Sequence, residues 1–573
     1  MARRKPKVPD YEILRAALRK LRPSGARSLE ALLCELLSAL TERRFFLGAA
    51  GSQQGRDFST GGLAGTWIAV EAKRFRESTD FRQKELLGEI LELSLQTPHP
   101  DLWTLVASRS IPDQLASTLR QAGLKSGVEV EVLEAPTSRP GDLDFLCASH
   151  PGIVVQYISD DLLPVLHRLQ ARSSSARHLH LLRKRFCTPS LGFDHVKKKV
   201  QTWFREALEG PEEARARLGG QPLALLSLAA NLVRRKGAEE ALAAWWQGWG
   251  CNPRPFILLG EEGVGKTWAA AAWAELQAAR STETILLFVP SRDVDTTDPT
   301  ELIRHFLCEA TGRTDTPPRF WKLRIDSWLA RSTEVAPVLL LLLDGINERP
   351  DHEWRDLFDR LNGLPWRGRV AVLVTCRPGY WTTARFMPEQ NPVQLKLEGF
   401  DDPELDEALQ KSGRIRTEFS SDLLPLVRKP RYLALVIKHY DCLEETGDFT
   451  IDRLLYEDWK DRLERKRSLK MTDRQYRTFL GQLAQRYREG RTRFSERDLD
   501  HLLPRSAAND LSELLTNGLL SVDHKLAQEY KVEPGWLIHS HGLLLASQLI
   551  ERGDEAELEE TLAQFLEPHL EVD

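Results

Sequence analysis

Phe256-Ile-Leu-Leu-Gly-Glu-Glu-Gly-Val-Gly-Lys-Thr267 is an apolar run that ends in a glycine-rich loop. Glycines let successive backbone N–H groups turn inward around phosphate oxygens, the lysine reaches the β and γ phosphates, and the hydroxyl holds Mg²⁺. The alanine-rich stretch 268–279 predicts a helix whose positive N-terminal end points at the same phosphates. We therefore predict a phosphate-binding loop with nucleotide contacts from Gly260, Gly263, Gly265, Lys266 and Thr267, the last also a metal ligand.

Two further apolar runs predict buried strands of a parallel sheet. Val338-Leu-Leu-Leu-Leu-Leu343 leads into Asp344-Gly-Ile-Asn-Glu348, and Val370-Ala-Val-Leu-Val-Thr375 leads into Cys376-Arg377. Ligands bind outside the carboxyl ends of the strands in such sheets. We expect Asp344 to hold Mg²⁺ through water and Glu348 to polarise the attacking water. Arg377 is expected to sense the γ-phosphate.

These motifs resemble the NACHT-type branch of the STAND NTPases, which includes animal NLR proteins and bacterial antiphage Avs proteins. The resemblance implies that ATP and ADP are the ligands, together with Mg²⁺. It also implies that the stretch 423–435 is the helical segment of the family, with Pro430 near bound adenine. Asn347 stands where the family often has a second acid, which implies slow hydrolysis or hydrolysis through Glu348 alone.

The C-terminal sequence predicts a winged helix. Residues 510–522 are typical of a helix that is stopped by Gly518 and followed by a strand, and residues 529–538 supply a hairpin partner. STAND winged helices often carry a histidine that touches the β-phosphate of ADP in the resting state, and His539 matches it. The alternative is a histidine bonded within a core strand. By analogy, the winged helix would lock the ADP form.

A second group of polar residues lies near the N-terminus. In the strand predicted by Trp67-Ile-Ala-Val-Glu71-Ala-Lys73, side chains alternate faces, so that Glu71 and Lys73 share one face. Asp57 precedes this strand across a hairpin. Two carboxylates and a lysine at the open face of a sheet can bind Mg²⁺ and activate water for phosphodiester hydrolysis. The alternative is a solvated salt pair on a strand edge.

This second group resembles the PD-(D/E)XK nuclease fold, close to the Mrr-like group. The resemblance implies that Asp57, Glu71 and Lys73 are catalytic and that Asp57 and Glu71 hold the metal. Relatives often place an additional glutamate on the helix in front; Glu30 is the matching metal ligand, and Glu35 is its alternative. The predicted order of elements is αββαβαβ, which suits a nuclease core. Arg56 departs from the proline that precedes the aspartate in part of the family.

Composition sets further bounds on the chain. Its 573 residues allow three or four domains, and 42% hydrophobic with 28% charged residues is typical of globular proteins. The longest apolar runs fall short of the ~20 residues of a membrane span, and the N-terminus has no apolar signal core, so we expect a cytoplasmic protein without membrane contact. Seven scattered cysteines indicate neither a zinc site nor a disulfide framework.

The net charge is −4, which does not indicate nucleic-acid binding by the chain as a whole. However, nine lysines and arginines lie between positions 167 and 199. This segment is expected to connect two domains, where it would either follow a DNA backbone or form a solvated helical linker.

We expect a multidomain α/β chain. Its predicted parts are a nuclease domain at 1–158, a basic linker at 159–195, a P-loop NTPase domain with a parallel sheet at 196–395, a helical domain at 396–465, and a winged-helix domain with a C-terminal tail at 466–573.

The expected function is that of an ATP-controlled DNA endonuclease of a bacterial antiphage system. Nucleotide-dependent assembly into a homo-oligomer would activate Mg²⁺-dependent cleavage of double-stranded DNA, in response to a phage-derived trigger or a separate sensor protein. Two alternatives stay open: an ATP-driven, restriction-like DNA-processing enzyme, and a signalling scaffold that does not cut.

Overall fold

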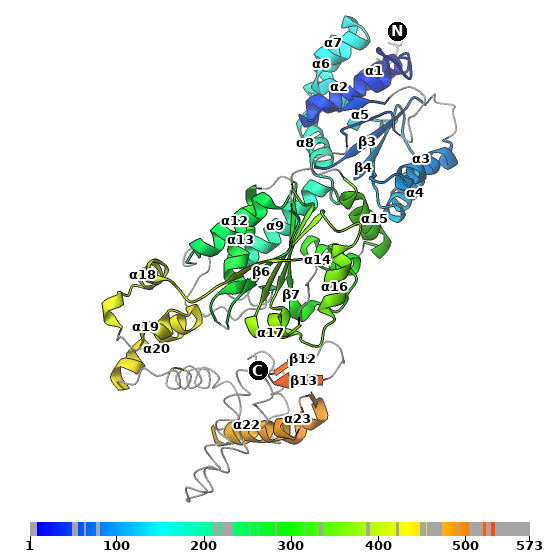
Figure 1. Cartoon of the computed structure of the whole chain (residues 1–573). Coiled ribbons are helices and arrows are strands. Elements are labelled where there is room, and N and C mark those ends of the chain that lie inside the picture. The colour runs from blue at the N-terminus through cyan, green and yellow to red at the C-terminus, as the bar shows by residue number, and fades with distance from the viewer. Residues whose placement is uncertain are drawn as a thin grey trace, which may run out of the picture. The chain divides into compact units, whose positions relative to one another are not determined.

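The computed structural model divides into two units, residues 1–414 and 415–573 (Figure 1). The residues that the structure describes are 8–48, 56–61, 65–75, 81–133, 135–209, 217–218, 233–250, 252–261, 263–280, 283–314, 316–331, 336–384, 390–419, 423–446, 454, 473–489, 491, 493–502, 520–522 and 529–532.

The N-terminal part of the first unit is a five-stranded sheet of order β1-β2-β3-β4-β5. Strands β1, β2 and β3 pair antiparallel, and β3, β4 and β5 pair parallel. The elements are α1 Asp10–Leu18, α2 Leu29–Thr41, β1 Phe46–Leu47, β2 Phe58–Ser59, β3 Ile68–Lys73, α3 Gln83–Leu95, β4 Leu102–Ala107, α4 Asp113–Lys125 and β5 Glu129–Leu133.

Helices cover both faces of this sheet because residues of β3 and β4 alternate between two cores (Figure 1). Ile68 and Val70 pack with α1 and α2, whereas Trp103 and Leu105 pack with α3 and α4. Helix α2 begins at Leu29 because the Ser28 hydroxyl accepts a hydrogen bond from Ala31 N and caps the first turn. From α2 onwards the order of these elements matches the expected αββαβαβ except for the additional strand β1, and α1 is an additional helix ahead of it. Its assignment to a nuclease fold stays a prediction.

The segment expected to be a basic linker is helical and packed against the N-terminal core. Its apolar side chains, Leu166 and Phe186 among them, are buried with those of α1 and α2. Several of its arginines pair with acidic residues of the same domain: Arg168 with Asp10, Arg183 with Glu42, and Arg185 with Glu131 and Asp142. The segment is helical, as one of the two alternatives expected, but its apolar face is buried and not solvated. The domain boundaries themselves stay predictions. The segment contains η1 Asp160–Leu162, α7 Leu163–Gln170 and α8 Ser175–Cys187, and helices α5 Asp142–Ser149 and α6 Pro151–Tyr157 precede it.

The second sheet of the first unit is parallel throughout, with strand order β10-β6-β9-β8-β7. The three apolar runs of the sequence form β6, β8 and β9, as predicted. Its elements are α9 Phe193–Glu209, α12 Lys236–Gly248, β6 Phe256–Leu259, α13 Lys266–Arg280, β7 Ile285–Pro290, η2 Ser291–Asp293, α14 Pro299–Thr311, α15 Pro318–Leu329, β8 Leu339–Asp344, η3 Ile346–Glu348, α16 Trp354–Asn362, β9 Val370–Cys376, α17 Pro378–Ala384, β10 Val393–Lys396 and α18 Asp402–Lys411.

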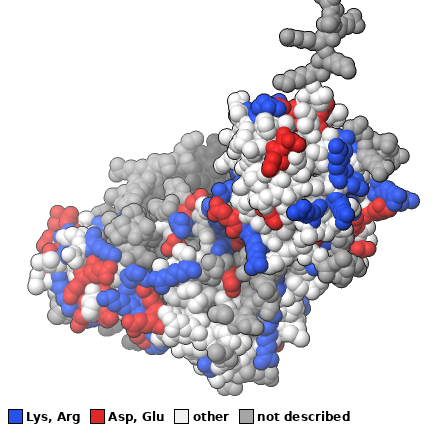
Figure 2. Space-filling model, turned by 90° about the horizontal axis from the view of Figure 1, so that it is seen from above, with Lys and Arg blue, Asp and Glu red and all other residues white. Residues whose placement is uncertain are grey.

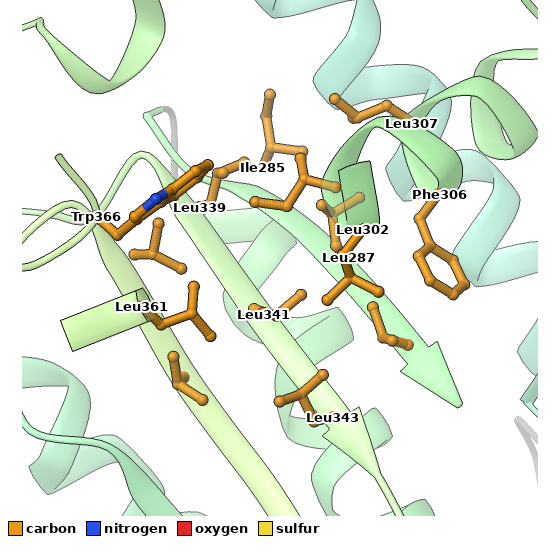
Figure 3. Close-up of a cluster of buried hydrophobic side chains, with 14 of the residues drawn as sticks. Ile285, Leu287, Leu302, Phe306, Leu307, Leu339, Leu341, Leu343, Leu361 and Trp366 are labelled. Carbon is orange, nitrogen blue, oxygen red and sulfur yellow. The ribbon is translucent and has the colours of Figure 1, made fainter. Parts of the chain in front are cut away.

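The strands of this sheet are apolar on both faces because helices cover both. Leu339, Leu341 and Leu343 of β8 pack with α14 and α16 (Figure 3), and Leu340 and Leu342 pack on the opposite face with α12 and α13. The apolar residues of the strands are therefore buried between two layers of helices, and polar residues lie at the carboxyl ends of the strands.

The second unit contains helices and a small antiparallel sheet of order β11-β13-β12. Strands β12 and β13 form the hairpin pair expected from the sequence. The predicted helix near 510–516 and His539 lie outside the described residues, so the winged helix stays a prediction. None of the helices in the described ranges has the length and apolarity to cross a bilayer. The elements are η4 Arg416–Glu418, α19 Leu424–Val427, α20 Pro430–Thr446, α22 Asp473–Arg488, β11 Phe494–Ser495, α23 Glu496–Leu502, β12 Leu520–Val522 and β13 Glu529–Val532.

Candidate nucleotide site and candidate nuclease site

The glycine-rich loop joins the end of β6 to the start of α13. Gly263 and Gly265 have φ values of +78° and +90°, which side-chain-bearing residues rarely adopt. A Cβ at Gly260 would lie 2.8 Å from both Leu397 O and a methyl group of Val264. The loop therefore requires glycine at all three predicted positions, for its backbone conformation or for close packing.

Lys266 folds back over the loop from the first turn of α13. Its Nζ donates to Gly260 O at 2.7 Å and to Glu261 O at 2.9 Å. Burial lowers the pKa of Lys266, and the charge of Asp344 opposes that shift. The ammonium group thus sits inside the loop, where a phosphate would offer it a stronger, charged partner.

Asp344 ends β8 and is buried between two hydroxyl groups. Thr375 Oγ1 donates to Asp344 Oδ1 at 2.6 Å, and Thr267 Oγ1 donates to Asp344 Oδ2 at 3.0 Å. Gly345 N donates to Thr375 Oγ1 at 2.8 Å. Burial raises the pKa of Asp344, and the bonds from the two threonines oppose the rise. Thr375 was not predicted as a site residue, although its place at the end of β9 was a usable signal.

Glu348 lies in η3, beside Asp344. Burial, followed by the charge of Asp344, raises the pKa of Glu348 to about 7, while the charges of Arg292 and Arg377 act in the opposite direction. The backbone N–H of Arg377 donates a hydrogen bond to Asn347 Oδ1 at 3.1 Å, which connects the end of β9 to η3. Arg292, just after β7, was missed by sequence reasoning, although it too follows the carboxyl end of a strand.

The predicted loop, acid and arginine therefore meet at one edge of the sheet. A carboxylate and a hydroxyl in contact, Asp344 and Thr267, are suitable oxygen donors for Mg²⁺. Pro430 begins α20 in the second unit, and its contact with adenine stays a prediction. The same holds for the contact of His539 with ADP.

The N-terminal sheet gathers a second set of charged groups. Asp57 Oδ2 accepts a hydrogen bond from Ala72 N at 2.7 Å, which fixes the aspartate against β3. Lys73 Nζ pairs with Glu71 Oε1 and, at 2.8 Å, with Glu89 Oε1 of α3. Glu71 is only 4% exposed, so the pair is not the solvated surface pair of the alternative interpretation.

The carboxyl groups of this set act on one another electrostatically. Burial, then the charges of Asp57 and Glu89, raise the pKa of Glu71 to about 8. Burial, then the charge of Asp57, raise the pKa of Glu30 to about 7, against the opposing charge of Lys73. Burial also raises the pKa of Asp57. The structure thus brings the four predicted residues together and adds Glu89, for which the sequence held no pattern.

Two observations bear on metal binding by this set. Within the described ranges, no three His, Cys, Asp or Glu side chains are placed to share one metal ion. However, Mg²⁺ is commonly held by one or two carboxylates and several waters, and Asp57 with Glu71 could supply these. Glu35, the alternative to Glu30, instead accepts a hydrogen bond from Tyr157 Oη at 2.7 Å.

Comparison with solved structures finds similarity at low sequence identity. Cdc6p from Pyrobaculum aerophilum is 14% identical with a TM-score of 0.27, and covers 55% of this chain and 93% of its own. The Aeropyrum pernix ORC1 protein in complex with DNA is 17% identical with a TM-score of 0.30, and the match covers 56% of this chain and 95% of the ORC1 chain. The Thermotoga maritima RuvB Holliday junction branch migration motor is 14% identical with a TM-score of 0.25, and the match covers 54% of this chain and 97% of the RuvB chain.

Among curated proteins, none matches this sequence. The NACHT domain family model matches residues 254–414. This span begins just before β6 and contains the loop, Asp344, Glu348 and Arg377. Residues 254–414 are therefore a NACHT domain, a P-loop NTPase domain of the STAND type.

Proposed function

We propose that this chain is a nuclease controlled by the nucleotide bound to its NACHT domain. The observation that carries the nuclease part is the set formed by two buried carboxyl groups, Asp57 just before β2 and Glu71 on β3, with the half-buried Lys73 on β3. Carboxyl groups whose pKa values are raised by burial cluster at functional sites. The NACHT domain supports binding and hydrolysis of a nucleoside triphosphate.

In the nucleotide site, Lys266 would exchange the carbonyls of Gly260 and Glu261 for β and γ phosphate oxygens. Asp344 and Thr267 would hold Mg²⁺, which neutralises phosphate charge when bound. Glu348, with a pKa near 7, would accept the proton of the attacking water. Arg377 and Arg292 add positive charge on the side of Glu348, where negative charge develops during hydrolysis.

In the nuclease site, Asp57 and Glu71 would hold Mg²⁺, which would lower the pKa of a bound water. The water oxygen forms a bond to phosphorus and releases a proton to solvent, while the bond from phosphorus to the leaving oxygen breaks and that oxygen takes up a proton from solvent. Lys73 would stabilise the charge that develops on the phosphate. Its ammonium group has three N–H donors, and the pairs with Glu71 and Glu89 use two of them, so the third can reach a phosphate oxygen.

Double-stranded DNA is the proposed substrate. On the face shown in Figure 2, basic and acidic side chains lie side by side, so attraction of the DNA backbone has to come from local groups. We further propose that the chain assembles into a homo-oligomer in the ATP state. A phage-derived trigger or a separate sensor protein would start this assembly, and the biological role would be antiphage defence.

The test is cleavage of plasmid DNA by the full chain with Mg²⁺, in the presence of ATP, ADP or neither. Wild-type protein should nick or linearise the plasmid, and Glu71→Gln and Lys73→Met should lose this activity. Glu85→Gln is a matched control, because Glu85 is an exposed residue of α3 that pairs with Arg82. Cleavage by Glu71→Gln at the wild-type rate would refute the site.

A second candidate, a scaffold that does not cut, is favoured by the lack of a three-ligand metal group in the described ranges. It predicts DNA or partner binding without cleavage under every nucleotide condition. Retention of function by Lys73→Met in a phage-challenge assay would support it. The ATP-driven, restriction-like enzyme instead predicts fast ATP hydrolysis that DNA stimulates.

A further inference from the structure

Arg235 is a buried arginine beneath the phosphate-binding loop. Its guanidinium group donates from Nη1 to Val264 O at 2.7 Å and from Nη2 to Glu398 O at 2.7 Å and Gly399 O at 3.0 Å. Its Nε donates to Glu404 Oε2 at 2.9 Å, and the group lies over the ring of Phe400. Its side chain is 7% exposed. One side chain therefore joins the loop, the chain that follows β10, and helix α18.

The bond to Val264 has a direct consequence for phosphate binding. Val264 O and the N–H of Gly265 belong to the same planar trans peptide unit, in which the two groups point in opposite directions. Gly263 and Gly265, on either side, have positive φ values and few steric restrictions. A donor that holds Val264 O from below thus keeps the Gly265 N–H directed to the other side of the loop.

The bond to Glu404 connects the same guanidinium group to α18. Glu404 is the third residue of that helix and completes a capping box, because Glu404 N donates to Asp401 Oδ1 at 2.8 Å and Asp401 N donates to Glu404 Oε2 at 3.2 Å. A shift of the loop would therefore reach the first turn of α18 through two hydrogen bonds. Helix α18 lies directly ahead of the boundary of the second unit, which begins at Ile415.

We propose that Arg235 is a positioning residue of the nucleotide site: it presets the Gly265 N–H for phosphate and transmits the state of the loop to α18 through Glu404. This role rests on nucleotide binding by the NACHT domain and is independent of the nuclease. It differs from a purely structural ion pair, because it predicts an effect on phosphate recognition that a general loss of stability does not produce.

The first experiment measures the affinities of the full chain for ADP and AMP by titration calorimetry. Arg235→Met keeps most of the side-chain volume and removes all four hydrogen bonds. It should weaken the binding of ADP by roughly tenfold to a hundredfold, which is the usual effect of losing hydrogen bonds to charged groups. It should weaken the binding of AMP by much less, since AMP lacks the β-phosphate. Arg234→Met is the matched control, because Arg234 pairs with Glu239 on the surface.

The second experiment measures hydrogen exchange of residues 402–411 with and without ADP. In the wild type, ADP should change exchange in this helix. Glu404→Met removes the acceptor for Arg235 Nε but keeps the contact of Arg235 with Val264, so it should keep ADP affinity within about threefold while the response of the helix is lost. Glu407→Gln, on the same helix and paired with Lys411 near the surface, should respond as the wild type does.

The outcomes separate the two levels of the proposal. Absence of ADP binding by the wild-type chain would overturn both the nucleotide site and the role of Arg235. Wild-type ADP affinity in Arg235→Met, or an equal loss of ADP and AMP affinity, would overturn the positioning role alone. An intact response of α18 in Glu404→Met would overturn the transmission step.

Discussion

Asp101 is the group whose removal should most disturb the first unit. It precedes β4 and is 0% exposed. Its carboxylate accepts from Arg324 Nη1 at 2.6 Å, Trp328 Nε1 at 2.8 Å and Arg331 Nη2 at 2.5 Å, and from Trp67 N at 2.8 Å. Burial alone would raise the pKa of Asp101, but the charges of Arg331 and Arg324 lower it to about 2. One carboxylate therefore joins the N-terminal sheet to α15 and the residues after it.

Asp101→Ala would leave two arginines buried without their partner, since the side chains of Arg324 and Arg331 are 0% and 4% exposed. Breaking a buried pair in this way costs about 3–5 kcal/mol. Because each 1.4 kcal/mol is tenfold, amide exchange that proceeds through opening of this junction should accelerate by roughly a hundredfold to several thousandfold.

The assay is native-state hydrogen exchange of β3, β4 and α15, which reports local opening and does not require two-state unfolding of a multidomain chain. Glu42→Ala is the matched control: it also breaks an arginine pair, with Arg183, but Glu42 is 73% exposed, so the expected cost is under about 1 kcal/mol. If Asp101→Ala accelerates exchange in these elements by no more than Glu42→Ala does, the reasoning is refuted.

Three further predictions concern the nucleotide site and the same junction. Lys266→Ala should weaken the binding of ATP and ADP by at least about a hundredfold in calorimetric titration, because the loop loses its charged contact with the β and γ phosphates. Unchanged affinity would contradict the assignment of the phosphate-binding loop. Glu348→Gln should retain ATP binding but lower its hydrolysis by roughly a hundredfold or more, and the wild-type rate should rise with pH through about 7, since only the deprotonated carboxylate accepts a proton. A flat pH profile of the wild type would exclude Glu348 as the base. Burial, then the charge of Arg324, lower the pKa of His99 from 6.5 to about 4, so the unfolded chain binds the proton first. Stability should therefore be lost as the pH falls from 6.5 towards 4, by up to about 3 kcal/mol, and His99→Gln should reduce that loss in urea titrations followed at several pH values.

The strands and the nucleotide site of the NACHT domain were predictable because their signals are local. Runs such as 338–343 and 370–375 are apolar throughout, as strands covered on both faces must be. The carboxyl ends of parallel strands converge, so Asp344 and Arg377 could be assigned to one site before any coordinates. Strand β10, in contrast, is an edge strand whose side chains alternate between half-buried and exposed, and no apolar run marks it.

Residues whose role depends on tertiary contacts could not be predicted. Glu89, Asp101 and Arg235 lie in stretches without a motif, and each acquires its partners from residues distant in the sequence. Tertiary contacts also explain why the basic segment 167–199 was misjudged from its sequence. Its charge was read as a sign of exposure, whereas amphipathic helices bury its apolar residues and acidic neighbours pair with several of its arginines. Charge along a sequence does not tell which charges are already neutralised.

The charge balance of the N-terminal set is a further argument for a function there. Glu71 and Asp57 are each 4% exposed, and Glu30 and Glu89 contribute more negative charge, yet Lys73 is the only cation that their pKa shifts report. Burying carboxylates in excess of cations destabilises a fold, and apolar residues of similar volume would serve packing better. A bound divalent cation would offset that excess. This charge balance therefore supports the proposal that Asp57 and Glu71 hold Mg²⁺.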